Sequence, residues 1–230
     1  MMARRSAELP DTTQPQGHHA RNLWIAVVLV VAIVAAVASW YALRPATPAP
    51  QAAPTATSAP SDPGTGLANG CLAGPGKTVK ELIAAQKTAP KTTLGAVELA
   101  ASFARWYAQY PWPSPADAKA ASSAFAATDA SPTIKDLPAR YASRPKQPAG
   151  EIAGISLVKG RYFIKSADAD SASVVIGSKS VENGVESATF AFSQTFSMMW
   201  EGGVWKVADI SYTMDPQDLF DQGTPFAGGC

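Results

Sequence analysis

The longest uninterrupted apolar run of the chain is residues 23–43, which contain no charged side chain. As a helix the run would rise about 31 Å at 1.5 Å per residue, close to the ~30 Å hydrocarbon core of a bilayer. Trp24 lies at one end, and Trp40 and Tyr41 lie at the other, where interfacial aromatic side chains belong. The pattern therefore predicts one transmembrane helix.

Positive charge is unevenly distributed around this run. Three arginines precede it and one follows it: Arg4, Arg5, Arg21 and Arg44. Because cytoplasmic flanks carry the excess of Lys and Arg, residues 1–22 are predicted to be a cytoplasmic tail and the rest of the chain to be exported. A cleaved signal peptide is the alternative, since residues 36–38 (Ala-Val-Ala) fit a cleavage site, but the run is longer than the apolar region of most signal peptides.

Residues 44–66 have the composition of a linker. They contain six prolines and two charged side chains among many Ala, Thr and Ser residues. Such a stretch cannot bury a core and favours extended polyproline conformation, which could hold the next domain up to about 70 Å from the bilayer. The sequence thus predicts a spacer followed by one exported domain, residues 67–230.

The first half of this domain has helical periodicity. Helices are predicted for residues 78–87, for residues 92 or 93 to 110, and for residues 114–126, each starting at a Thr or Ser cap. The middle helix carries an apolar stripe at i, i+4, i+7, i+8 and i+11, formed by Leu99, Phe103, Trp106, Tyr107 and Tyr110. This stripe is typical of a core-facing helix.

From Glu151 the apolar period changes to two, which is typical of strands. The predicted strands are residues 152–157, 162–165, 173–176, 187–200 and 204–212. Turns are predicted at Gly160, at residues 168–170, at Asn183-Gly184 and at residues 201–203. Helices followed by antiparallel strands indicate an α+β fold with helices packed on one face of a curved sheet. The expected interior side chains are Phe103, Trp106, Phe190, Phe192 and Trp205.

Composition limits the chemistry. The 19 Lys and Arg residues nearly balance the 18 Asp and Glu residues, which gives a formal net charge of +1. A charge this close to zero argues against electrostatic binding of nucleic acid. The two histidines, His18 and His19, precede the apolar run, and the two cysteines lie far apart. These counts argue against a zinc site, a Cys-His nucleophile or a Ser-His-Asp triad. No cofactor motif or calcium loop is recognisable, because the required glycine and acidic spacings are missing.

Cys71 and Cys230 lie at the two ends of the exported domain. In a compartment that permits disulfides, this placement predicts an intrachain bridge. Two free thiols, or an intermolecular bond through Cys230, are the alternatives.

A carboxylate is the remaining type of general base, since the exported domain has no histidine. Asp209 on the last predicted strand is the main candidate, with Glu186 and Tyr162 as others, and a structural role for Asp209 is the competing interpretation. If the domain contains a cavity, the candidate lining residues are Asp209, Gln194, Trp106 and Tyr162.

Three features together resemble a known family. The short and long opening helices, the long strand, and the hairpin at residues 200–207 (Trp-Glu-Gly-Gly-Val-Trp-Lys-Val) are similar to the cone-shaped α+β fold of nuclear-transport-factor-like proteins. A tail, one anchor, a Pro-rich spacer and such a domain resemble the bitopic assembly factors of type IV secretion and conjugation machines. The opening at residues 70–74 (Gly-Cys-Leu-Ala-Gly) is similar to proteins of actinobacterial conjugative elements.

The resemblance covers about residues 67–215 and implies a non-enzymatic membrane component of a DNA-transfer or secretion apparatus. Its expected partners are other membrane and secretion-apparatus proteins, with self-association left open, and no direct contact with nucleic acid is expected. Catalytic members of the family place a His or Asp in the cone, and only Asp209 could replace it here. An exported small-molecule binder or cone-fold enzyme, or a cell-envelope protein unrelated to secretion, are the alternative functions.

Overall fold

The computed structural model of the chain describes residues 66–145 and 150–230. The predicted transmembrane segment, residues 23–43, lies outside these two ranges. Within them, none of the helices has both the length and the apolar character that a membrane span requires.

Three helices form where the sequence predicts them: α2 (Val79–Thr88), α3 (Thr93–Tyr107) and α4 (Pro115–Phe125). Each starts at a side-chain cap, formed by Thr78, Thr92 or Ser114, whose hydroxyl accepts a hydrogen bond from a backbone N–H of the first turn. These caps satisfy N–H groups that a helix start would otherwise leave without a partner.

Helix α3 ends at Tyr107, three residues before the predicted end at Tyr110. Pro111 disfavours helical backbone at Tyr110, which instead exchanges two backbone hydrogen bonds with Ala153 (2.7 and 3.1 Å). Three short helices were not predicted: α5 (Pro132–Lys135), α6 (Leu137–Ala142) and α7 (Pro216–Gln222). All three carry proline in the first turn, where its missing N–H costs nothing.

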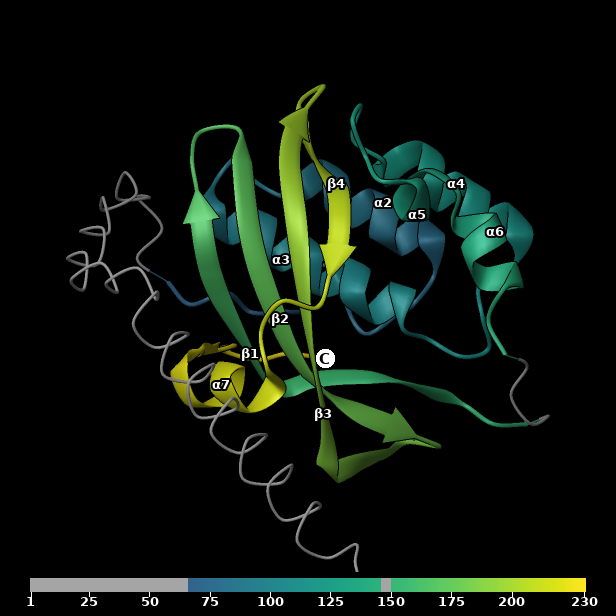
Figure 1. Ribbon diagram of the computed structural model, residues 1–230, viewed down its shortest axis with the longest axis vertical. Coiled ribbons are helices and arrows are strands. Elements are labelled where there is room, and N and C mark those ends of the chain that lie inside the picture. The colour runs from purple at the N-terminus through teal and green to yellow at the C-terminus, as the bar shows by residue number, and fades with distance from the viewer. Residues whose placement is uncertain (1–65, 146–149) are drawn as a thin grey trace, which may run out of the picture. The chain divides into compact units, whose positions relative to one another are not determined.

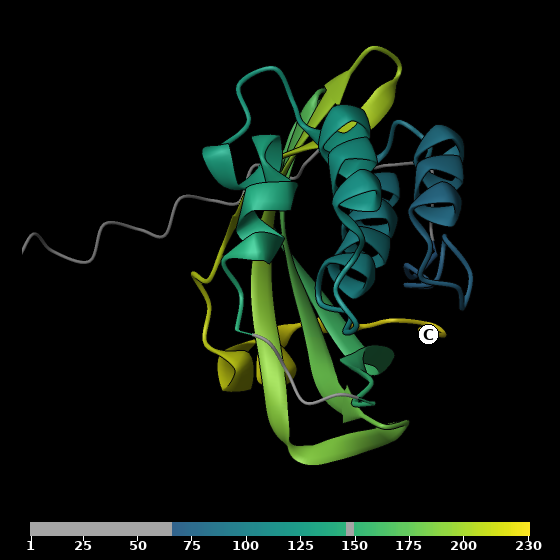
Figure 2. The ribbon, with the colours of Figure 1, turned by 90° about the vertical axis from the view of Figure 1, so that its right-hand side faces the viewer.

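The second half of the domain is one antiparallel sheet in the order β4-β3-β2-β1-β5 (Figure 1). Its strands are β1 (Ala153–Ala167), β2 (Ser171–Glu182), β3 (Val185–Glu201), β4 (Val204–Ser211) and β5 (Thr224–Pro225). Helices α2, α3 and α4 stack on one face of the curved sheet (Figure 2). The predicted α+β class is therefore confirmed.

The predicted turn at Gly160 is wrong, because residues 153–167 form the single strand β1. The pairing of β1 with β2 instead shifts register between Ser156 and Arg161. A Cβ atom on Gly160 would lie 2.6 Å from the carbonyl oxygen of Gly177, closer than any side chain could tolerate. Glycine here permits a bulge in a continuous strand rather than a reversal of the chain.

The core lies between α3 and the sheet. Phe103 is fully buried, with its ring centroid between 5.3 and 6.3 Å from those of Trp106, Tyr107, Phe125 and Phe196. These four rings come from helices α3 and α4 and strand β3, so one side chain connects the helical layer with the sheet.

Trp205 closes the core at β4. Its ring is 1% exposed, and its indole N–H donates to the carbonyl of Pro90 (2.8 Å) in the turn between α2 and α3. The predicted interior positions of Phe103, Trp106 and Trp205 are thus confirmed.

The predicted interior positions of Phe190 and Phe192 are wrong, since 68% and 43% of these residues are exposed. The register between β2 and β3 shifts between Lys179 and Val181, so that residues 187–190 have no partner on β2. This half of β3 extends past the helices that cover Phe196. Alternation of apolar residues continues there without a layer to bury it.

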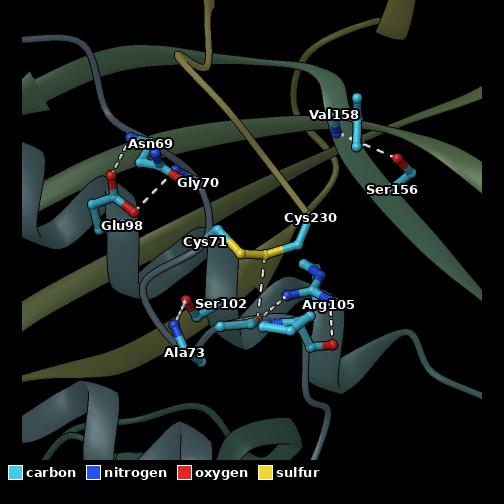
Figure 3. The surroundings of a disulfide bond; sticks show 12 residues. Asn69, Gly70, Cys71, Ala73, Glu98, Ser102, Arg105, Ser156, Val158 and Cys230 are labelled. Atoms are coloured by element: carbon cyan, nitrogen blue, oxygen red, sulfur yellow. Dashed lines mark hydrogen bonds between the residues drawn. A yellow bond between two sulfur atoms is a disulfide. The ribbon is translucent and has the colours of Figure 1, made fainter.

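The predicted disulfide is present. Cys71 is bonded to Cys230 across 159 residues, with 5.4 Å between the two Cα atoms (Figure 3). The Leu157 N–H of strand β1 donates to the carbonyl of Cys230 (2.9 Å), which attaches the last residue to the sheet as well. The disulfide therefore joins the segment before α2 to the last residue, and a hydrogen bond joins that residue to the edge of β1.

Side chains of α3 hold the segment before α2 in place. Arg105 is 4% exposed, and its guanidinium donates to the carbonyls of Gly74 (2.8 Å) and Pro75 (3.0 Å). Glu98 accepts hydrogen bonds from the backbone N–H groups of Asn69 and Gly70 (Figure 3). Because these contacts are independent of the sulfur atoms, the segment is secured by hydrogen bonds as well as by the disulfide.

Candidate functional site

A cavity of about 340 Å³ opens between the end of α3 and the part of the sheet that extends beyond the helices. We call it the aromatic pocket. Its aromatic lining residues are Tyr107, Tyr110, Trp112, Phe192 and Tyr212, and its polar ones are Arg144, Glu151, Ser180, Glu182 and Gln194. Aromatic walls with a few polar groups are typical of ligand sites.

Arg144 is the central cation of the pocket. Its guanidinium carbon lies 4.6 Å from the ring centroids of Tyr107 and Trp112 and 4.7 Å from that of Tyr141. One of its N–H groups donates to the carbonyl of Tyr107 (3.3 Å). Three rings and one hydrogen bond thus orient a planar cation, whose charge is attracted to the ring faces.

The hydroxyl of Tyr141 donates to the same carbonyl oxygen of Tyr107 (3.1 Å). Burial raises the pKa of Tyr141 above its ordinary value and outweighs the opposing effect of the nearby Arg144 charge. The phenol therefore stays protonated at physiological pH and acts as a fixed hydrogen-bond donor.

Other polar groups are arranged around the opening. The side-chain amide of Gln194 donates to the hydroxyl of Tyr212 (3.2 Å), which joins β3 to the chain leaving β4. The indole N–H of Trp112 is buried and has no hydrogen-bond partner among the described residues. The pocket thus combines aromatic walls with polar side chains at its opening, an arrangement suited to binding.

Gln194 is the one candidate lining residue that the structure places in the aromatic pocket, as far as the described residues show. Trp106 and Tyr162 are in the core, 1% and 4% exposed. Trp106 packs edge-to-face on Tyr141 at 5.9 Å, and the Tyr162 hydroxyl accepts from the N–H of Ala68 (3.4 Å). Trp106 and Tyr162 are therefore core packing residues and do not line the aromatic pocket.

Asp209 pairs with Ser197 across β3 and β4, and the next pair along is Val207 with Met198, so Ala208 is an extra residue on β4. Met198 and Val207 are buried in the core. Because this bulge interrupts the alternation, Asp209 shares the face of Ser197, opposite the core. The four candidate residues are therefore not gathered in one site.

Sequence reasoning missed most of the pocket. The segment Tyr110-Pro111-Trp112-Pro113 has a recognisable pattern, two aromatic residues alternating with prolines, but the pattern alone does not indicate a pocket. Arg144 has no local signal, since its role depends on three rings that come from different segments. The pocket is assembled by tertiary structure.

Five exposed apolar residues lie at the start of β1, on β3 and on the chain leaving β4, and two of them, Phe192 and Tyr212, also line the pocket. They are Ile152, Val185, Phe190, Phe192 and Tyr212, which are between 43% and 71% exposed, and we call them the hairpin surface. The carbonyl of Ile152 accepts from the N–H of Asn183 (2.7 Å) in the turn between β2 and β3, which links the start of β1 to this hairpin. Large exposed apolar side chains of this kind are typical of binding surfaces.

Within the two described ranges, no three His, Cys, Asp or Glu side chains are grouped so that they could hold a metal ion. The chain was also compared with known proteins. It matches no protein-family model, no curated protein and no solved structure.

Proposed function

We propose that the chain is a non-enzymatic, single-pass membrane component of a conjugative DNA-transfer or type IV secretion-like apparatus. Its exported domain acts as a scaffold that binds other proteins of the apparatus. The observation that supports binding is the hairpin surface, where Phe190 and Val185 are 68% and 71% exposed. When a partner protein removes exposed apolar groups of this kind from water, the free energy of the system falls, which favours binding.

Charge around the hairpin surface favours a protein over a membrane as its partner. Glu151 and Glu182 line the adjoining pocket, and Glu186 follows Val185 on β3. Carboxylates repel the anionic lipids to which peripheral membrane surfaces are usually attracted. A partner protein can instead offer basic side chains around an apolar centre.

The assignment to a DNA-transfer or secretion apparatus rests on the resemblance. That resemblance is carried by the opening helices, the long strand and the hairpin at residues 200–207. The proline-rich spacer supports a role at a distance from the membrane, because an extended segment can carry a binding domain toward its partners.

Transfer frequency in the native host tests this function. Phe190→Ser, deletion of residues 44–66, and deletion of the anchor should each reduce transfer by at least about tenfold, because binding or placement is lost. Asp209→Asn and Val158→Ser should leave transfer unchanged, since Asp209 lies opposite the core and Val158 is an exposed residue away from the hairpin surface.

All variants should be compared at matched protein levels. If Asp209→Asn abolishes transfer in a folded protein while shortening the spacer has no effect, the scaffold function is wrong. Unchanged transfer in every variant would instead favour a cell-envelope role outside secretion.

A small-molecule-binding function is the second candidate, favoured by the aromatic pocket. Its 340 Å³ volume and the oriented Arg144 guanidinium suit a small ligand with an anionic or planar group. Native mass spectrometry of protein purified from its host tests this function. A bound small molecule that is lost on Arg144→Ala would support ligand binding over the scaffold role.

A further inference from the structure

The chain covers most edges of its own sheet. At β4, the N–H of Ala127 donates to the carbonyl of Val207 (3.1 Å), and the N–H of Ser131 donates to that of Ala208 (2.8 Å). The loop after α4 therefore occupies the outer edge of β4. Such covering is a common way to prevent another chain from adding a strand.

The outer edge of β1 is covered as well. Tyr110 pairs with Ala153, Cys230 accepts from Leu157, and the N–H of Phe226 donates to the carbonyl of Gly160 (3.2 Å). Beyond this point β5 pairs with β1 at Arg161 and Tyr162. Four separate contacts thus occupy this edge along most of its length.

The first part of strand β3, which extends past the end of β4, has an outer edge that the described residues do not cover in this way. The pairing of β3 with β4 extends from Glu201 to Thr195 and stops there, because the chain leaves β4 after Ser211 and crosses the sheet to reach α7 (Figure 1). Residues 191–194 remain paired with β2 on one side. Among the described residues, no strand pairs with their other side.

A groove lies beside this open stretch. It has a volume of about 480 Å³ between residues 191–193 of β3 and residues 212–216. Ser193 on its wall is 4% exposed, and its hydroxyl has no hydrogen-bond partner among the described residues. The open strand edge, with its unpaired backbone groups, is the feature that an added strand would complete.

Side chains around the open edge define what could dock there. Phe190 and Phe192 are exposed beside it. Of the nearby acidic side chains, Asp215 lines the groove, Glu151 and Glu182 line the adjoining aromatic pocket, and Glu186 lies at the start of β3.

The nearby cations already have partners. Lys179 lies 4.8 Å from the ring centroid of Phe220, and Arg144 is held by three rings. Lys165 donates to the hydroxyl of Thr213 on the groove wall (3.1 Å). An added strand with apolar and basic side chains would complement this surface.

We propose that residues 191–194 of β3 accept an extended segment of a partner protein as an added strand, in which apolar and basic side chains alternate. This inference rests on the proposed scaffold function and specifies its mode of binding. A second copy of β3 is a poorer occupant, because residues 185–194 contain Glu186 and no Lys or Arg. Two such strands would bring no basic side chain to the acidic surface.

Hydrogen–deuterium exchange on the full chain in phosphatidylcholine nanodiscs tests the proposal. The probe is a short synthetic peptide in which valine alternates with arginine. In one control peptide every arginine is replaced by glutamate, and in the other every second valine is replaced by proline. We expect the arginine peptide to slow exchange of the amides of residues 185–194. The proline peptide should not, because it lacks N–H groups for strand pairing.

Charge reversal gives a second readout. Glu182→Lys and Glu186→Lys should each raise the dissociation constant of the arginine peptide by about three- to tenfold. Asp129→Lys, at an exposed loop position near α5, is the matched control and should leave the constant unchanged. Unchanged exchange in the rest of the domain would confirm that each variant is folded.

Slowed exchange at another site, equal binding of the proline peptide, or no binding would overturn strand addition. Slowed exchange of the same amides without peptide, growing with protein concentration, would indicate a second copy and would also overturn the proposal. The same holds if the slowing requires anionic vesicles. If strand addition fails while Phe190→Ser still reduces transfer, the scaffold function stands and only its mode is wrong.

Discussion

Replacing Phe103 by alanine is expected to lower the free energy of unfolding of the folded domain by about 3–5 kcal/mol. The side chain is fully buried, and its ring contacts four other aromatic rings from two helices and a strand. Its removal leaves a cavity at the junction of the helical layer and the sheet, which the surrounding rings cannot fill without moving. Urea unfolding of residues 66–230 followed by tryptophan fluorescence measures the effect.

Phe190→Ala is the matched control. The same chemical change at a residue that is 68% exposed should alter the free energy of unfolding by no more than about 0.5 kcal/mol. Equal losses for the two variants would contradict the placement of the core, because they would mean that both rings are buried. A larger loss at Phe190 would also show that the hairpin surface is part of the core.

Removing the disulfide should have an effect of similar size. The double variant Cys71→Ser, Cys230→Ser is expected to lose roughly 2–5 kcal/mol of stability, because a bridge spanning 159 residues restricts the unfolded chain strongly. The contacts of Arg105 and Glu98 remain, so the folded state should keep its secondary structure. Circular dichroism and urea unfolding of both forms measure these two outcomes.

Mass spectrometry without reduction provides the covalent check. The native protein should be lighter than its reduced form by the mass of two hydrogen atoms, and it should yield one linked peptide pair. Two thiols that react without prior reduction, or a covalent dimer, would refute the intrachain bridge. Equal stability of the native protein and the double variant would show that the bridge adds nothing to the folded state.

Helices α2, α3 and α4 could be predicted because their signals are local, whereas the short helices α5, α6 and α7 were missed. Thr78, Thr92 and Ser114 cap α2, α3 and α4, and the apolar stripes that follow them leave one choice of buried face. The hairpin between Trp200 and Trp205 was equally readable, since two glycines separate two strands of alternating pattern. Together these signals were enough to predict the α+β class.

Features that depend on distant contacts were not predictable. Gly160 has the same local signature in a turn and in a bulge, and what selects the bulge is the carbonyl of Gly177 on the neighbouring strand. The exposure of Phe190 depends on where the helical layer ends, which the strand's own sequence does not encode. Alternation predicts which residues share a face, but not whether another layer covers that face.

The candidate site shows the same limit. Gln194 was identified because it is a polar residue within an apolar alternation, a local signal. Arg144 could not be identified, because the rings of Tyr107, Trp112 and Tyr141 that hold it come from a helix end, a proline-rich turn and α6. The orientation of Asp209 could not be predicted, because a single extra residue, Ala208, reverses the alternation of β4.

Photo-cross-linking in native membranes tests most directly whether the folded domain is a protein-binding scaffold. A photoreactive amino acid is placed at Phe190 on the hairpin surface in one variant, and at Val158, which is 57% exposed on β1, in the other. The account predicts a covalent adduct with another membrane or secretion-apparatus protein from position 190 and none from position 158. Adducts from position 158 alone, or from neither position in cells that transfer DNA normally, would contradict it.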